Sequence, residues 1–263
     1  MTEPVLLRED RDDVATLTLN APERLNPLSD AMLAALADAF AAIGDDRAVK
    51  AVVLRGAGKA FCAGHDLREM QAARQAKDRG AAYFADLFGR CAAVMQAIPR
   101  LPQPVIAEVH GIATAAGCQL VASCDMAVAA EGTRFGVNGV NIGLFCSTPM
   151  VALTRNIPRK AAFEMLTTGR FIEAGEAQAL GLVNRVVPPE RLGEETRELA
   201  ATVAGKLGAA VRIGKQTFYR QVELGLADAY AHAGEVMVEN MLWRDTEEGV
   251  AAFLEKRRPD WRG

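Results

Sequence analysis

The order of apolar and polar positions predicts alternating strands and helices along the first half of the chain. Residues 14–19 (VATLTL) alternate as in a half-buried strand. The apolar runs at 49–56 and 104–111 each end in glycine and have the length of buried strands. After the first strand, Ser29 is a suitable N-cap and Gly44 can close a helix. Apolar residues follow Ser29 at helical spacing: Leu33, Leu36, Ala37, Phe40 and Ile43.

The second half repeats this strand-to-helix pattern. After the small-residue turn IATAAG, the segment CQLVASCD begins a helix, and residues 126–136 predict another strand with a turn. A helical stretch broken near Pro158, a helix at EAGEAQALG and a strand at LVNRVVP follow, and the residues beyond 190 have a helical pattern. Alternating strands and helices favour an α/β fold. We expect a core of residues 1–195 and a helical C-terminal region of residues 196–263.

Composition narrows the class of protein. With 50% apolar residues, a net charge of −3 and a pI near 5.8, the chain gives no reason to expect a nucleic acid or an anionic membrane as partner. Polar residues interrupt the longest apolar stretch, 105–130, which favours buried core over a membrane span. The 5 cysteines form no C-x-x-C pair and the 3 histidines are scattered, so we expect reduced thiols and no metal site. The first residues resemble neither a signal nor a transit peptide, and a cytoplasmic location is expected.

Motifs for phosphate binding and nucleophilic catalysis are incomplete. In GAGKAF, Phe61 replaces a glycine of the dinucleotide pattern, and Val53 and Ala60 do not fit a P-loop. Cys62 and His65 are close in sequence, but no third group to orient them is evident. There is no G-x-S-x-G segment for a hydrolase serine. A simple turn is the better interpretation of GAGKAF.

Two short segments, FCAGHDL and TAAGCQL, each join small residues to the start of a helix. The first turn of a helix presents unpaired backbone N–H groups and the positive end of the helix dipole. Two such ends aimed at one point can hold a developing oxyanion. The alternative is that both are tight junctions in which small side chains only ease packing.

The ordered segments resemble the crotonase superfamily, the enoyl-CoA hydratase/isomerase family, over nearly the whole chain. The matching segments are PERLNPL, GKAFCAGHDLREM, PVIAEVHGIATAAGCQLVASCDMAVA, TRFGVNGVNIGL, LTTGRFIEAGEAQALGLVNRVV and AAFLEKRRPDW. The resemblance implies a ββα spiral with a C-terminal helical trimerisation region, as a homotrimer or a dimer of trimers. It also implies a CoA thioester as substrate, with no separate cofactor.

The resemblance assigns roles to residues of both segments. The backbone N–H groups of His65 and Ala116 would hold the thioester oxygen as it becomes an enolate, and one such donor can contribute about 2.7–4 kcal/mol. Other matched positions would contact CoA. Arg24 and Leu25 would lie along it, Ala63, Asp66 and Leu67 near its pantetheine, and Phe253 and Lys256 at its nucleotide end. For Lys256, a solvated helix face is the alternative interpretation.

The sequence departs from the family where hydratases carry their two glutamates. Gln119 and Gly139 occupy those positions, so neither carboxylate is present and ordinary hydration of a 2-enoyl-CoA is not expected. Hydratase- or isomerase-type chemistry would then need Asp66 or His65 as a base, although Asp66 can instead cap its helix. The loop-like segment 71–84 is expected to help set the width of the acyl pocket.

Other functions remain open from the sequence. The AGHD segment looks like that of methylmalonyl-CoA decarboxylases, whose tyrosine position corresponds to Cys146, and decarboxylation of a malonyl-type CoA needs no base. Thioester hydrolysis would need a base that is not evident. A non-catalytic acyl-CoA-binding protein is the remaining alternative. GVNIGLFCSTP together with HDL is similar to the mitochondrial enoyl-CoA hydratase domain-containing proteins, a subgroup that lacks the catalytic glutamates.

Overall fold

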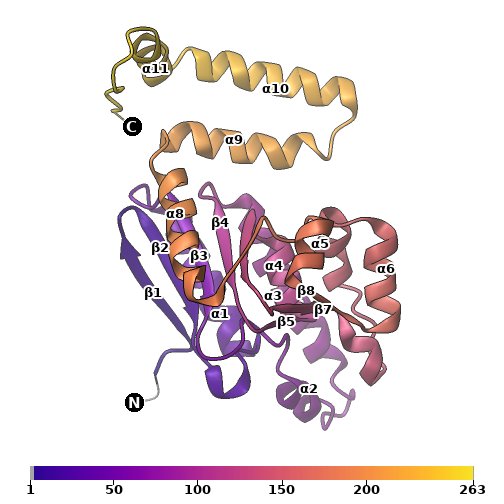
Figure 1. Ribbon diagram of the computed structural model, residues 1–263. Helices are drawn as coiled ribbons and strands as arrows, with labels where there is room; N and C mark the ends of the chain where they lie inside the picture. The colour runs from indigo at the N-terminus through magenta and orange to yellow at the C-terminus, as the bar shows by residue number, and fades with distance from the viewer. Residues whose placement is uncertain (1–2, 263) are drawn as a thin grey trace.

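A six-stranded sheet runs through the centre of the protein, seen in a computed structural model that describes residues 3–262 (Figure 1). Its order is β1-β2-β3-β4-β6-β9. The strands are β1 (Leu6–Arg11), β2 (Val14–Leu19), β3 (Ala51–Gly56), β4 (Val105–Val109), β6 (Met126–Ala130) and β9 (Arg185–Val187). Only the edge pair β1–β2 is antiparallel among these described strands. The central strands are apolar runs because helices cover both faces of the sheet. The predicted α/β class is confirmed.

A second sheet of three short strands lies beside the first. It contains β5 (Ile112–Thr114), β7 (Arg134–Gly136) and β8 (Phe171–Glu173), in the order β5-β7-β8. The predicted strand with a turn over residues 126–136 is confirmed as β6 and the turn after it, but the residues beyond the turn form a second strand, β7, which was not predicted. Gly132, with φ +76°, turns the chain between β6 in the main sheet and β7 in the small one. In each repeat, the chain forms one strand of each sheet and then a helix, which is the ββα unit.

Seven α-helices surround the sheets before the C-terminal region. They are α1 (Asp30–Asp45), α2 (Leu67–Ala73), α3 (Ala81–Arg100), α4 (Ala116–Ser123), α5 (Pro149–Asn156), α6 (Arg159–Thr168) and α7 (Ala174–Leu180). Short 3-10 turns are η1 (Pro22–Arg24), η2 (Asn138–Ile142) and η3 (Pro189–Arg191). The Ser29 cap is confirmed, since its side chain accepts from Met32 N at 3.2 Å. Gly44 does not close α1, because the helix continues to Asp45.

The segment expected to be a loop, residues 71–84, is mostly helical at its two ends. Helix α2 ends at Ala73 and α3 begins at Ala81, so only the residues between them form a connection. The buried positions of α3 have helical spacing: Leu87, Cys91, Val94, Met95 and Ile98. Helix α3 packs against both α1 and α4.

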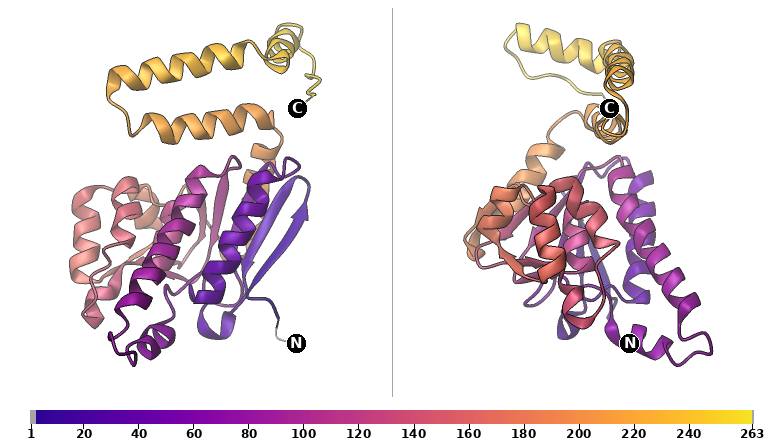
Figure 2. Two further views of the ribbon diagram at one scale, coloured as in Figure 1. Left: turned by 180° about the vertical axis from the view of Figure 1, so that it is seen from behind. Right: turned by 90° about the vertical axis from the view of Figure 1, so that its right-hand side faces the viewer.

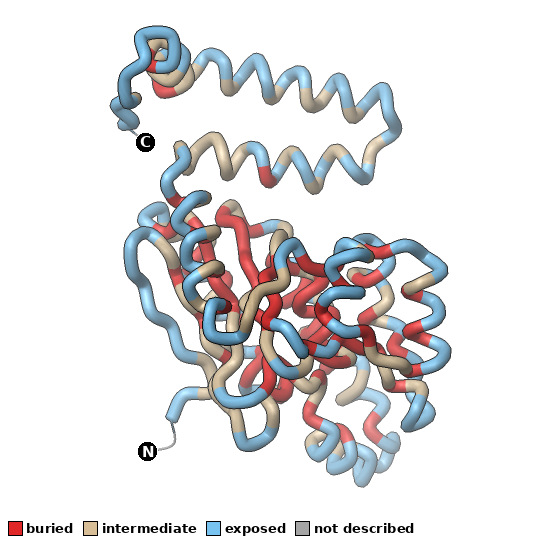
Figure 3. Tube along the Cα trace, in the orientation of Figure 1, coloured by how far each residue is buried: buried red, intermediate tan, exposed pale blue. Residues whose placement is uncertain are grey.

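The C-terminal helices divide into one that covers the sheet and three that leave it. Helix α8 (Leu192–Ala204) packs on the main sheet, and the expected boundary at residue 195 falls inside it. Helices α9 (Gly208–Gln221), α10 (Leu226–Met241) and α11 (Arg244–Leu254) form an arm that extends away from the core (Figures 1 and 2). Figure 3 shows that much of this arm is exposed. Its exposed residues include the large apolar Leu226, Leu242 and Phe253. Within residues 3–262, no helix combines the length and the hydropathy that a membrane crossing requires.

A buried ion pair fixes the base of the arm to the core. Lys215 on α9 contacts Asp125 Oδ2 at 2.6 Å and donates to the carbonyl oxygens of Ile98 and Gln103, both at 2.8 Å. Tyr219, one turn further along α9, donates to the other oxygen of Asp125 at 2.7 Å. Asp125 stands immediately before β6 and also accepts from Val105 N at 2.6 Å. The arm is therefore attached to the core through the buried Lys215–Asp125 pair, in which both charged groups have several hydrogen-bond partners.

Candidate active site

The two strand-to-helix segments singled out in the sequence lie side by side. Cys62 and Ala113 form a parallel bridge in which Cys62 N donates to Ile112 O at 3.1 Å and Thr114 N donates to Cys62 O at 3.0 Å. A Cβ on Gly117 would lie only 2.2 Å from Cys62 O. Residue 117 must therefore be glycine because two backbones approach each other there. At Gly117, the small residue therefore serves to let the two backbones pack closely.

The same arrangement brings two unpaired backbone donors together. Over residues 3–262, the N–H groups of His65 and Ala116 donate to no protein acceptor. Ala116 is the first residue of α4, so its N–H has no acceptor within the helix. A Cβ on Gly64, the residue before His65, would lie 3.3 Å from Ala116 N. The two donors thus belong to backbone segments in direct contact.

Ala115 is held in an unusual conformation just before α4. Its φ of 50° and ψ of −118° lie in a region that side-chain-bearing residues rarely adopt, at a cost on the order of 1–3 kcal/mol. Its N–H donates to Gly136 O at 2.8 Å, and its carbonyl accepts from Gln119 N at 3.0 Å. These bonds fix the turn that leaves the next N–H, that of Ala116, unpaired. Apart from the small size of Ala115, no sequence pattern indicates this strain.

Two buried polar atoms without partners lie in the same two segments. Within the described residues, 4 buried side-chain N or O atoms lack a hydrogen-bond partner: His65 Nε2, Gln103 Oε1, Gln119 Oε1 and Arg170 Nε. Such atoms are rare in folded proteins, since an unpaired buried polar group is costly. Gln119 is only 5% exposed on α4. Two of these four atoms belong to the two strand-to-helix segments.

The imidazole of His65 is oriented by its neighbours. Its Nδ1 lies 3.3 Å from Leu28 O, and its ring meets Phe88 of α3 edge-on with centroids 5.7 Å apart. Because a carbonyl can only accept, Nδ1 carries the proton and Nε2 keeps its lone pair. Burial lowers the pKa of His65 below its ordinary 6.5; the hydrogen bond to Leu28 O opposes this, Arg90 lowers the pKa further, and Asp30 raises it. The ring is therefore neutral at pH 7.

Asp66 has a structural role that uses both of its carboxylate oxygens. One caps α2 by accepting from Arg68 N at 2.9 Å, and the other pairs with Arg24 at 2.6 Å. The side chain is 6% exposed. The capping interpretation is confirmed, and neither oxygen is left free to serve as a base.

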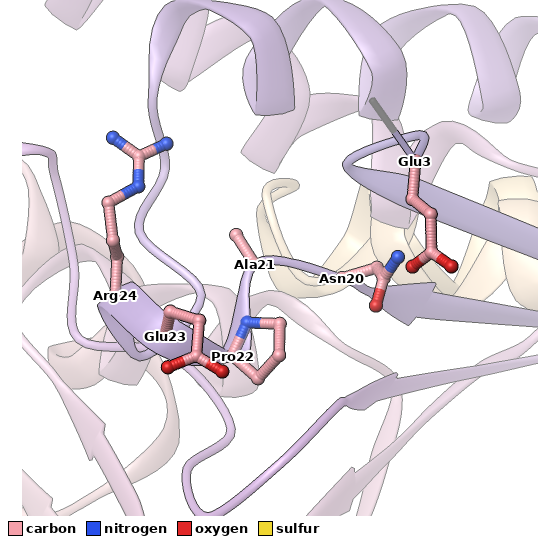
Figure 4. A pocket seen from close by; sticks show the side chains of 6 residues that line it. All are labelled: Glu3, Asn20, Ala21, Pro22, Glu23 and Arg24. Carbon is pink, nitrogen blue, oxygen red and sulfur yellow. The ribbon is translucent and has the colours of Figure 1, made fainter. Parts of the chain in front are cut away.

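The residues expected along the first part of CoA lie together around this pair. Leu25 O accepts from Ala63 N at 3.0 Å, and Leu67, the first residue of α2, is exposed. Beside them, a pocket of about 310 Å³ lies along η1 and the residues before it (Figure 4). In Figure 4, Arg24 and Glu3 stand at opposite ends of the pocket.

Gly139 has no room for a side chain. A Cβ there would lie 2.3 Å from Leu144 O and 2.9 Å from Cys146 Sγ. The loop between η2 and α5 therefore occupies the space in which a residue-139 side chain would begin. Cys146 is 6% exposed, and burial raises the pKa of its thiol, which stays protonated at neutral pH. The backbone path therefore excludes any side chain at residue 139.

Phe253 and Lys256 are not brought to this site within one chain. Phe253 is 82% exposed near the end of α11, which lies at the opposite end of the molecule from α2 (Figures 1 and 2). It borders an apolar pocket of about 430 Å³ between α9, α11 and the C-terminal residues. The pocket is lined by Leu207, Ala210, Asn240, Thr246, Gly249, Val250, Phe253, Leu254 and Trp261.

The stacked ββα units, the two sheets and the helical C-terminal end make up the crotonase fold. The chain belongs to the enoyl-CoA hydratase/isomerase family, whose model matches residues 9–263. It is 45% identical over 250 residues to the human enoyl-CoA hydratase domain-containing protein 3, mitochondrial, covering 95% of this chain and 81% of the relative. A crystal structure of that human protein matches with a TM-score of 0.93 at 44% identity, covering 98% of this chain and 100% of the other. An enoyl-CoA hydratase structure from Mycobacterium smegmatis matches with a TM-score of 0.95 at 57% identity, covering 99% and 100%.

These relatives correct the expected location. The human protein and its relatives from Xenopus laevis and Rattus norvegicus are named mitochondrial. The prediction of a cytoplasmic location is therefore wrong. It rested only on the composition of the first residues, and a targeting segment is removed from a mature protein without affecting its fold.

Proposed function

We propose that the protein binds acyl-CoA thioesters and stabilises the thioester enolate between the backbone N–H groups of His65 and Ala116. The observation that carries this proposal is a pair of unpaired N–H donors on two backbone segments that touch each other. An added Cβ on Gly64 would lie only 3.3 Å from Ala116 N. Membership of the enoyl-CoA hydratase/isomerase family supports a CoA thioester as the ligand. No separate cofactor is required for this chemistry.

Fixed backbone donors favour enolate formation over simple binding. The thioester oxygen is neutral when the substrate binds and becomes negatively charged as the enolate forms. Donors already aimed at this oxygen therefore lower the energy of the transition state more than that of the bound substrate. The protein is thus proposed to carry out hydratase/isomerase-like enolate chemistry, with the half-buried aromatic residues of α3 bordering the acyl group.

Isothermal calorimetry with butyryl-CoA tests the proposal directly. We expect saturable binding to the full chain, with CoA alone binding more weakly because it lacks the thioester oxygen. A series of acyl chains at millimolar concentration would extend the test. Absence of binding across that series would contradict the proposed function.

Ordinary hydration is expected to be absent or very slow. Gln119 can accept a hydrogen bond from water but cannot take its proton, and Gly139 has no side chain. We therefore expect a kcat for crotonyl-CoA hydration below about 1 per second, under the usual range for enzymes. Loss of the enoyl absorbance measures it. The Gln119→Glu variant should also remain inactive, because Leu144 O and Cys146 Sγ still occupy the second carboxylate position.

We also propose that the arm of α9 to α11 joins copies of the chain, as a homotrimer or a dimer of trimers. Large apolar side chains on this arm are 56–82% exposed, among them Val222, Tyr230, Met241, Leu242 and Phe253. Apolar surface of this extent on an extended arm is typical of an interface. A neighbouring chain could then supply Phe253 and Lys256 to the nucleotide end of CoA.

A further inference from the structure

We propose that the imidazole of His65 is the catalytic base that replaces the missing glutamates of this site. The inference rests on the proposed function, because it assigns the proton transfer that forms the enolate. Three observations carry it. The Nε2 atom of His65 has no hydrogen-bond partner, and the contact of Nδ1 with Leu28 O fixes the tautomer. The imidazole also belongs to the residue whose backbone N–H is one of the two proposed donors.

The other polar groups of the two strand-to-helix segments cannot serve as the base. Both oxygens of Asp66 are bonded, one to Arg68 N and one to Arg24. Gln119 cannot take a proton at ordinary pH. Burial raises the pKa values of Cys62 and Cys118 to about 12, so both thiols stay protonated. His65 is left as the group with a free lone pair.

The surroundings of His65 hold its ring in one tautomer and one orientation. The Leu28 carbonyl accepts the Nδ1 proton, and Phe88 supports the ring edge-on. The charged groups that face the ring are Asp30 at the start of α1 and Arg90 on α3, which also form an ion pair with each other at 2.6 Å. Burial is the largest effect on the pKa of His65 and lowers it, although the hydrogen bond to Leu28 O and the charge of Asp30 act in the opposite direction.

The proposed step transfers one proton and one electron pair. The Cα–H bond of the bound acyl group breaks, and the proton passes to His65 Nε2, which forms an imidazolium. The bonding electrons move into a Cα–C double bond, and the charge appears on the thioester oxygen between the N–H groups of His65 and Ala116. Return of the proton to Cα restores the substrate, and its return to Cγ of an enoyl group would move the double bond.

Exchange of the α-protons of butyryl-CoA in D₂O, followed by proton NMR, tests this role. With the wild-type protein, we expect exchange that is flat above neutral pH and falls tenfold per pH unit below an inflection under 6.5. The His65→Asn variant keeps the backbone donor but has no base, so its exchange should fall at least about 100-fold. Its calorimetric affinity for butyryl-CoA should stay within about threefold, a change of under 1 kcal/mol.

A matched histidine variant serves as control. The Nε2 of His110 already contacts Gly58 O at 2.8 Å, so His110→Asn should leave both the exchange rate and its pH profile unchanged. Exchange by His65→Asn within threefold of wild type, or binding without any exchange by the wild type, would overturn the role of His65. Failure of the wild type to bind acyl-CoA would instead refute the proposed function on which that role depends.

Discussion

Replacing Lys215 with methionine is expected to lower the free energy of unfolding by about 3–5 kcal/mol. The variant keeps much of the side-chain volume but leaves the Asp125 carboxylate, with its side chain 12% exposed, without its cation. The carbonyl oxygens of Ile98 and Gln103 lose a donor as well. An uncompensated buried charge is far more costly than the loss of a surface contact. Urea denaturation at one fixed protein concentration measures the change.

An exposed pair of the same chemistry provides the control. Lys50 contacts Asp13 at 2.8 Å, but the two side chains are 36% and 51% exposed. Lys50→Met should therefore cost no more than about 1 kcal/mol. Equal losses in the two variants would show that burial of the Lys215–Asp125 pair contributes nothing to the attachment of the arm.

The Gly117→Ala variant is expected to lose about 1–3 kcal/mol of stability together with most of its affinity for acyl-CoA. The added methyl group would meet Cys62 O at 2.2 Å, its carbonyl carbon at 2.8 Å and its Cβ at 2.9 Å. None of these is the movable end of a long side chain, so the two backbone segments must separate. Separation would also displace the N–H donors of His65 and Ala116 from each other. Urea denaturation and calorimetry with butyryl-CoA report the two effects independently.

Gly89→Ala is the corresponding control. Gly89 lies within α3, and no atom lies within 4 Å of an added Cβ. Alanine there should stabilise the protein by about 0.5–1 kcal/mol, because glycine loses more backbone freedom in a helix. Unchanged stability and binding in Gly117→Ala would contradict the close backbone approach.

The sequence predicted those features that depend on short stretches of chain. The alternation at 14–19, the Ser29 cap and the two small-residue helix starts are each encoded within a few residues, and the structure contains all of them. The predicted strand with a turn at 126–136 is present, but the sequence does not reveal that the residues after the turn form a separate strand in the second sheet. Helix α3 went unnoticed although its buried positions have helical spacing, since the charged connection before it resembled a mobile loop.

The surroundings of the candidate site could not be predicted from the sequence. The family resemblance assigned roles to His65, Ala116, Gln119 and Gly139, which stay predictions, and it could not show what surrounds these residues. The orphan Nε2 of His65 depends on Leu28, which is 37 residues away in the chain. The obstruction at Gly139 depends on the path of the following loop. Such contacts between distant segments arise from folding and have no local sequence pattern.

The proposed use of backbone donors at the two strand-to-helix segments affects which amino-acid substitutions the protein tolerates. Both proposed oxygen-binding donors are main-chain groups, so substitution of the side chain at 65 or 116 leaves the donors themselves in place. Gly117 and Gly64, which carry no side chain and no charge, instead allow the two backbone segments to approach each other. On the proposed function, enolate stabilisation would depend on glycines and backbone geometry, while the reaction that follows would depend on a few neighbouring side chains. A fold arranged in this way can change the reaction that it catalyses without changing the backbone that positions the two N–H donors.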